Sequence, residues 1–167
     1  DDVKKYFPDT VIIARPHTLC GDDVSMNKII EYDLSLIDGD YFLQTHSTNP
    51  LLSAGTIDRA LEFFFSNRNN YDSVFGVNRI QSRLYRSDGK AINHNPEDLI
   101  RTQDLEPVFE ENSTLYIFSR ESFKKAGNRR IGKKPYMFEV PRYEAVDIDT
   151  QADFDMAGYL YEYLRKT

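Results

Sequence analysis

Short apolar runs alternate with amphipathic helical patterns along the first half of the chain. The apolar runs lie at residues 10–14, 41–44 and 73–77, and a period near 3.6 predicts helices at 25–37 and from Ser53 or Thr56 onward. This order predicts βαβ units and a largely parallel sheet. Ligands of such sheets bind beyond the carboxyl ends of the strands. The loops that follow the three runs are therefore the candidate site.

The alternation breaks in the second half. Two short runs flank Asp88-Gly89, a dipeptide that strongly favours a β-hairpin. The absence of repeats and linkers favours one domain over residues 1–167, with a hairpin-bearing insertion. Strands are also predicted at 114–118 and 136–140, and a short one from Ala145 is closed by Asp147 and Asp149. A short helix is capped by Ser119 and ended by Gly127. The last predicted helix has one apolar face, formed by Phe154, Ala157, Leu160, Tyr161 and Leu164.

Asp147 and Asp149 stand directly before that last helix. Thr150 is its predicted N-cap, and Asp153 completes a variant capping box. Residues i and i+2 of an extended chain point to the same side, so the two carboxylates are expected to converge. A pair of carboxylates suits Mg²⁺, which takes its other ligands from water and phosphate. A charged strand end with a helix cap is the alternative, and a DxD motif alone favours it.

Composition narrows the class of partner. The 167 residues carry a net charge of −6, which argues against a nucleic-acid surface but allows an anionic substrate beside a metal or a local basic cluster. The single cysteine, Cys20, excludes an internal disulfide framework. No apolar stretch has the length of a membrane span and no signal peptide is recognised, so we expect no membrane contact and a cytoplasmic location.

A series of motifs follows in a fixed order, and the order and spacing are more specific than any single motif. The motifs are Arg15-Pro16 with Asp22 and Ser25, Leu43-Gln44 with Asn49-Pro50-Leu51, Arg101-Thr102-Gln103-Asp104-Leu105, Asn112 with Leu115-Tyr116-Ile117, and Val146-Asp147-Ile148-Asp149-Thr150 with Asp153-Phe154. Over essentially the whole chain this series resembles the acylneuraminate cytidylyltransferases, the CMP-sialic acid synthetase family.

The resemblance implies a fold and a reaction. The fold is α/β, a Rossmann-like, mostly parallel nucleotidyltransferase sheet whose β-hairpin insertion serves dimerisation. The reaction couples CTP to a nonulosonic (sialic-acid-like) sugar, giving a CMP-sugar and pyrophosphate with Mg²⁺ as cofactor. The residue roles implied are Asp147 and Asp149 as metal ligands with a catalytic part, Arg15 at the cytosine, Ser25 in the base-reading loop, Gln44 in the sugar site, and Arg83 and Arg101 near the sugar carboxylate.

Several positions depart from the family pattern. The opening strand and its phosphate-holding loop are absent before Asp1, so we expect that segment upstream. Ser113 stands where the family has glycine, and the loop after Gln44 is two residues longer than the usual Thr-Ser-Pro. The family often has aromatic residues in place of Arg129-Arg130, in a loop that crosses to the sugar site of the dimer partner. The Gly-Asp-Glu-Pro run of the related Kdo enzymes is missing, which disfavours Kdo as substrate.

Other interpretations stay open from the residues alone. Arg15 can be a solvated strand end, and Gln44 a buried amide that satisfies loop backbone. Arg83 and Arg101 are more often solvated than functional, while His46 lies in a site loop and is a candidate substrate contact. The basic run that includes Arg129 and Arg130 is either a solvated loop or a surface that meets a dimer partner or an anionic sugar. The competing functions are a non-catalytic nucleotide-sugar-binding module and a nucleotidyltransferase for another sugar or small acid.

Overall fold

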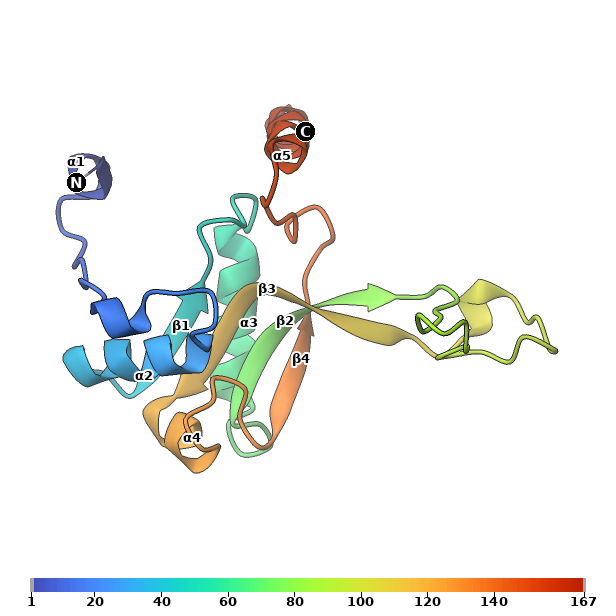
Figure 1. The fold of residues 1–167 in the computed structure, drawn as a ribbon, viewed down its shortest axis with the longest axis horizontal. Coiled ribbons are helices and arrows are strands. Elements are labelled where there is room, and N and C mark those ends of the chain that lie inside the picture. Colours follow the sequence, from blue (N-terminus) through green and yellow to red (C-terminus); the bar gives the residue numbers. More distant parts are fainter. Residues whose placement is uncertain (1, 167) are drawn as a thin grey trace.

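The computed structural model describes residues 2–166, and a mixed sheet of four strands forms its centre (Figure 1). The strands lie in the order β1 (Tyr41–Thr45), β3 (Val108–Ser119), β2 (Ser73–Ile80) and β4 (Pro135–Glu139). β3 is antiparallel to both of its neighbours, and β2 pairs with β4 in parallel, so β1, β2 and β4 share one direction. The α/β class is confirmed, and the predicted parallel sheet contains one antiparallel strand.

Helices cover both faces of this sheet. Along β3, Leu115 and Ile117 face α3 (Ala54–Ser66), while Tyr116 and Phe118 face α2 (Met26–Leu36) and α4 (Arg120–Lys125). Successive strand residues point to opposite faces, so a continuous apolar run is what a centrally buried strand requires. Ala60 and Phe64 complete the α3 core, and Ile30, Leu34 and Phe123 complete the other.

Three predicted helix caps are present. Ser53 accepts a hydrogen bond from the backbone N–H of Thr56 at 3.1 Å, and Ser119 forms a capping box with Ser122. Thr150 forms the predicted capping box with Asp153 at the start of α5 (Gln151–Leu164). Each cap satisfies N–H groups that the first helical turn leaves unpaired.

Helix α5 stands away from the sheet in Figure 1, and its predicted apolar face is only partly covered. Ala157 is buried, but Phe154 is 61% and Tyr161 is 52% exposed. The other described elements are α1 (Asp2–Tyr6) and two short 3₁₀ turns, η1 (His17–Leu19) and η2 (Thr102–Asp104). Among residues 2–166, no helix combines the length and the apolar character that a bilayer crossing needs.

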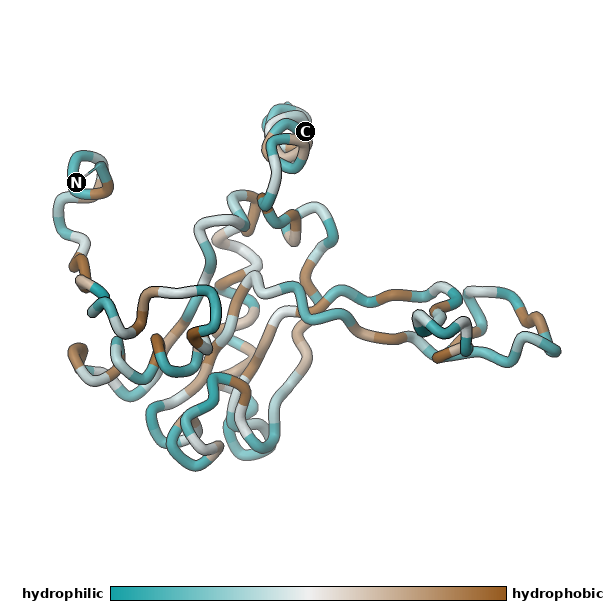
Figure 2. Tube along the Cα trace, viewed as in Figure 1, coloured by the Kyte–Doolittle hydropathy of each residue, from teal (hydrophilic) through white to brown (hydrophobic). Residues whose placement is uncertain are grey.

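Two predicted strands are wrong. The run at 10–14 forms no strand: Val11 is 78% and Ile12 is 52% exposed, and the segment lies off the sheet between α1 and η1 (Figures 1 and 2). An apolar run becomes a strand only with a ladder partner, and among the described residues this one has none. Residues 145–149 also form no strand, because their backbone bonds instead to the loop after β1.

The insertion is an extension of β2 and β3. Residues 77–80 pair with 108–111 as a two-stranded ribbon that leaves the body of the domain, and residues 81–107 form its tip (Figure 1). The predicted hairpin lies within this tip as a single bridge between Tyr85 and Ala91, supported by a 2.8 Å bond from Arg86 N to Lys90 O. A role of the extension in dimerisation stays a prediction.

The ribbon leaves the sheet at a bulge, and the backbone there explains why the family carries glycine where this chain has Ser113. The register of β2 shifts between Phe75 and Val77, and opposite it Ser113 adopts a φ of 57°. That left-handed conformation costs an L-residue about 1–2 kcal/mol but costs glycine little. The glycine that the family carries here therefore has a backbone reason.

Ser113→Gly is expected to raise the free energy of unfolding by about 1 kcal/mol, because it relieves the left-handed strain. The loss of the 3.3 Å hydrogen bond between the hydroxyls of Ser113 and Tyr116, in which Ser113 is the donor because the Tyr116 proton goes to Glu111, offsets a small part of the gain. Urea denaturation of wild type and variant measures the difference. Ser35→Gly, in the last turn of α2, is the matched control and should destabilise the protein by up to about 0.5 kcal/mol. A change of the same sign in the free energy of unfolding of both variants would contradict this explanation.

Candidate active site at the carboxyl end of β1

Five polar side chains gather where β1 ends, on the face of the sheet that α2 covers. We call Gln44, His46, Glu111, Tyr116 and Arg130 the β1-end cluster. They come from three separate parts of the chain: β1 and its exit loop, the middle of β3, and the basic loop after α4. This is the edge at which an α/β sheet binds its ligands.

Arg130 is the centre of the cluster. Its guanidinium carbon lies 3.5 Å from the centroid of the Tyr116 ring, a close cation–π contact. Its Nη1 donates to Gln44 Oε1 at 3.2 Å and approaches His46 Nε2 at 3.4 Å. Its Nη2 lies 3.6 Å from Glu111 Oε1, too far for a direct hydrogen bond. The guanidinium is thus held by one ring and two neutral acceptors, with a carboxylate slightly beyond reach.

The basic loop is fixed by backbone contacts. Asn27, in the first turn of α2, accepts a 3.1 Å hydrogen bond from Arg130 N. Asp72 accepts from the backbone N–H groups of Lys133 at 2.8 Å and Lys134 at 3.0 Å. A Cβ on Gly132 would lie 2.1 Å from Asp72 Oδ1, so glycine is needed for this approach. These contacts determine where Arg130 points.

Tyr116 is fully buried and stays protonated. Burial, followed by its hydrogen bond to Glu111, raises the pKa of Tyr116 to about 12. Its hydroxyl therefore donates to the Glu111 carboxylate at neutral pH. Tyr116 supplies a neutral, rigid platform for Arg130.

His46 is held neutral by its surroundings. Burial lowers the pKa of His46, the charge of Arg130 lowers it further, and the nearby Asp147 carboxylate opposes both. His46 Nε2 faces Arg130 Nη1 and, at 3.3 Å, Gln44 Nε2, both of which are donors. Nε2 must then be the acceptor, which places the imidazole proton on Nδ1.

The depressed pKa of His46 makes the stability of the protein depend on pH. As the pH falls below about 6.5, His46 takes up a proton in the unfolded chain more readily than in the folded protein. The free energy of unfolding therefore decreases as the pH falls through that range. His46→Gln should flatten this part of the profile, measured by urea denaturation between about pH 5 and 7. His17→Gln, the same change at an exposed turn, is the control. An unchanged slope in His46→Gln would contradict the assignment.

The segment that carries Asp147 and Asp149 is bound to the exit loop of β1. Asn49 Nδ2 donates to Val146 O at 3.1 Å, and Ile148 N donates to Thr48 O at 2.9 Å. The buried Glu144 accepts from Ser53 N, the N-cap of α3, at 2.9 Å. These bonds bring the segment alongside the β1-end cluster, and the charge of Asp147 reaches His46.

Asp147 and Asp149 alone do not complete a metal site, and a Mg²⁺ ion held by them would take its other ligands from water and substrate. Both aspartates are exposed, and within the described range no group of three or more metal-binding side chains forms. A magnesium ion commonly uses one or two carboxylates and keeps water and phosphate as its other ligands. Asp153, by contrast, is occupied: its Oδ2 accepts from Thr150 N at 2.8 Å and Asp149 N at 3.3 Å. Asp147 and Asp149 are the residues that could hold the ion.

The remaining predicted site residues lie in two other places. Arg15 lies beside α2: burial raises the pKa of Asp33 in that helix, and the charge of Arg15 lowers it by a smaller amount. Ser25 is the N-cap residue of α2, two positions before Asn27, although its side chain makes no capping bond. Arg83 and Arg101 lie on the extension: Arg83 Nη2 donates to Ile100 O at 2.5 Å, and Arg101 pairs with Asp104 at 2.7 Å. The structure thus gathers Gln44 with Asp147 and its neighbour Asp149, and their roles stay predictions.

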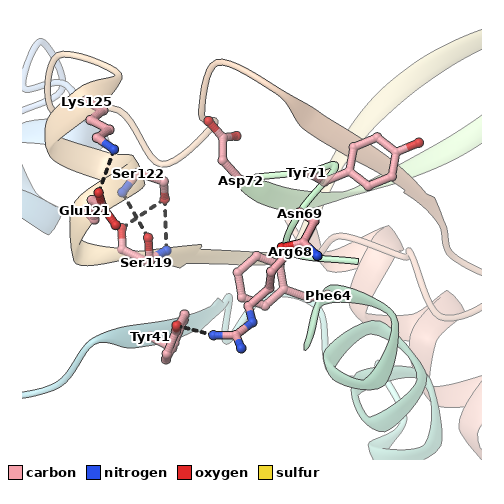
Figure 3. Close-up of a pocket in the computed structure, with 10 residues that line it drawn as sticks. All are labelled: Tyr41, Phe64, Arg68, Asn69, Tyr71, Asp72, Ser119, Glu121, Ser122 and Lys125. Carbon is pink, nitrogen blue, oxygen red and sulfur yellow. Dashed lines mark hydrogen bonds and ion pairs between the residues drawn. The ribbon is translucent and has the colours of Figure 1, made fainter. Parts of the chain in front are cut away.

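A hollow of about 320 Å³ lies at the end of the strands opposite to the β1-end cluster (Figure 3). Tyr41 begins β1 there, and Ser119 and Ser122 are engaged in the cap of α4. Lys125 pairs with Glu121, and Arg68 Nη1 donates to the Tyr41 hydroxyl. Its polar groups serve local structure at the amino ends of the strands, away from the ligand edge.

The structure adds residues that sequence patterns did not assign to the site. Tyr116 was predicted only as a strand residue, Glu111 had no predicted role, and Asn49 and Glu144 carried no signal beyond a motif position and a charge. Arg130 was considered only as part of a basic run that is either a solvated loop or a surface for a dimer partner or an anionic sugar. The packing of Arg130 on Tyr116 is a contact between distant segments, and single-sequence periodicity does not contain it.

The sheet with helices on both faces, and with two carboxylates and a polar cluster at the carboxyl edge of its parallel strands, is a Rossmann-like nucleotidyltransferase fold. The model of the cytidylyltransferase family matches residues 1–166, and the chain belongs to that family. It is also similar to the post-translational flagellin modification protein B of Campylobacter coli, with 24% identity over 125 residues. That alignment covers 72% of this chain and 52% of the relative, so the chain spans about half the length of the curated relative it matches.

Proposed function

We propose that this chain belongs to a Mg²⁺-dependent enzyme that couples CTP to a nonulosonic acid, giving a CMP-sugar and pyrophosphate. The observation that carries the proposal is that Asp147 lies close enough for its charge to act on His46, which contacts Gln44 at the carboxyl end of β1, in a chain of the cytidylyltransferase family. The similarity to a flagellin-modification protein is compatible with a product that is used in modifying a protein.

In this reaction the anomeric hydroxyl oxygen of the sugar attacks the α-phosphorus of CTP. The bond between the α-phosphorus and the bridging oxygen to the β-phosphate breaks, pyrophosphate leaves, and the hydroxyl proton is lost to solvent or a base. The metal, when bound, neutralises the charge on the phosphate oxygens. Asp147 and Asp149 hold it, and Gln44 orients the sugar through its amide. Arg15 and Ser25 are proposed to contact the base, and Arg83 and Arg101 the sugar carboxylate.

We also propose a homodimer in the cytoplasm, formed through the extension of β2 and β3. The extension projects from the domain and carries Arg83 and Arg101 with it (Figure 1). Two half-exposed aromatic or aliphatic side chains at its tip, Tyr85 at 53% and Ile92 at 50%, offer apolar contact area.

The test is pyrophosphate release by the full-length gene product with CTP, Mg²⁺ and a panel of nonulosonic acids. Release is expected only when nucleotide and sugar are both present, with CTP preferred over ATP, GTP and UTP. No release with any member of the panel contradicts the proposal. Binding of CTP or a CMP-sugar without turnover would favour the non-catalytic module, and release with a different acid or sugar would favour the third candidate.

A further inference from the structure

The guanidinium of Arg130 is partly buried without a hydrogen-bonded counter-charge. Its side chain is 15% exposed, and its hydrogen-bond acceptors in the β1-end cluster, Gln44 Oε1 and His46 Nε2, are neutral. The Glu111 carboxylate lies 3.6 Å away and already accepts the hydroxyl proton of Tyr116. A cation withdrawn from water is stabilised when an anion completes its coordination.

The space beside this guanidinium suits a small anion-bearing molecule. A hollow of about 350 Å³ opens next to it, and its lining includes Arg129 and the carboxylate-bearing Glu111 besides Asn27, Ile131 and Gly132. That volume lies within the range of small-molecule sites, about 300 to 1,000 Å³. The planar guanidinium can present two parallel donors to a carboxylate, which makes the geometry selective as well as attractive.

The other two arginines predicted for an acidic substrate are engaged elsewhere within the chain. Arg83 donates to the carbonyl of Ile100, and Arg101 makes two hydrogen bonds to Asp104, at 2.7 and 3.1 Å. Both lie on the extension, whereas Arg130 contacts Gln44 directly. Arg130 is therefore the guanidinium that this chain itself brings to the end of β1.

We propose that Arg130 binds the carboxylate of the acidic sugar in the site of its own chain, and so selects an acid over a neutral sugar. The inference rests on the proposed function, because it assumes that the sugar lies beside Gln44. Arg130 would then act in the site of its own chain, whereas the resemblance described above implies a loop that reaches the sugar site of the dimer partner. Tyr116 holds the guanidinium in place, and the substrate carboxylate displaces the weak pairing with Glu111.

Isothermal titration with each nonulosonic acid of the panel and with its carboxyl methyl ester tests this in the full-length protein. Arg130→Met is expected to raise the Kd of the acid about tenfold or more, which is the loss of one charge-assisted contact. The Kd of the methyl ester and the Kd of CTP should stay unchanged. Arg130→Lys keeps a cation near Tyr116 but lacks the planar pair of donors, so it should fall between wild type and Arg130→Met.

Lys134→Met is the matched control, since it removes a positive charge from the same loop while its backbone bond to Asp72 remains. An unchanged acid Kd in Arg130→Met, or an equal change for acid and ester, overturns the proposal. Arg130→Lys carries the test if the methionine variant fails to fold. Wild-type protein that binds no acid overturns it as well.

The binding measurement separates this proposal from the proposed function. Acid binding that depends on Arg130, without pyrophosphate release, supports the role of Arg130 and contradicts the enzyme. Pyrophosphate release, together with an acid Kd that is the same in wild type and in Arg130→Met, supports the enzyme and contradicts the role of Arg130.

Discussion

Asp149→Asn is expected to lower turnover at least about tenfold in the pyrophosphate-release assay. The substitution keeps the size of the side chain but removes a charge, and the charge stabilisation from one metal ligand exceeds about 1.4 kcal/mol. The apparent affinity for Mg²⁺ should weaken in parallel, and EDTA should abolish wild-type activity. The full-length protein is the sample, and initial rates across a Mg²⁺ titration give both quantities.

Folding should be unaffected by this change. Within residues 2–166, the carboxylate of Asp149 accepts no hydrogen bond, and the cap of α5 depends on Asp153 instead. Asp155→Asn makes the same exchange on the exposed surface of α5, where the carboxylate accepts only from Gln151 at 2.9 Å, and should leave turnover unchanged. Full activity in Asp149→Asn would remove the metal assignment, and equal losses in both variants would point to damage of α5.

Periodicity predicted the elements that depend on local residues. The strands at β1, β2 and β4 and the caps at Ser119 and Thr150 follow from nearby side chains, which is why these predictions are confirmed. The run at 10–14 has the same local signature, but a strand also needs a neighbour to pair with, and the described residues supply none. The antiparallel direction of β3 is likewise set by tertiary pairing, which no local pattern encodes.

The candidate site could be predicted only in part, for the same reason. Gln44 and Asp147 were expected at the carboxyl ends of strands, and the structure does bring them near one another through His46. Asp147 reaches that place by a different route from the one predicted: the bonds from Asn49 and Ile148 fix an irregular segment where a strand was expected. Arg130 arrives from a distant loop, so its contact with Tyr116 had no sequence signal.

The end of α2 depends on a single arginine, whose loss is expected to have the largest effect on stability. Arg120, the first residue of α4, donates from Nη1 to Leu34 O and from Nη2 to Ile37 O, both at 2.7 Å. Its Nε donates to Gly39 O at 2.9 Å. The carbonyls at a helix C-terminus carry partial negative charge and lack partners within the helix, so a cation satisfies them in two ways.

Arg120→Met should therefore lower the free energy of unfolding by about 3 kcal/mol, since three charge-assisted hydrogen bonds are lost and water replaces them only in part. Methionine also lacks the cation that lies 5.0 Å from the centroid of the Phe42 ring, so the measured loss includes this cation–π contact. Arg165→Met, which removes an exposed arginine 3.9 Å from Glu162, should cost less than about 0.5 kcal/mol. Urea denaturation of the three proteins compares them, and a loss in Arg120→Met no greater than in Arg165→Met would show that α2 ends without this support.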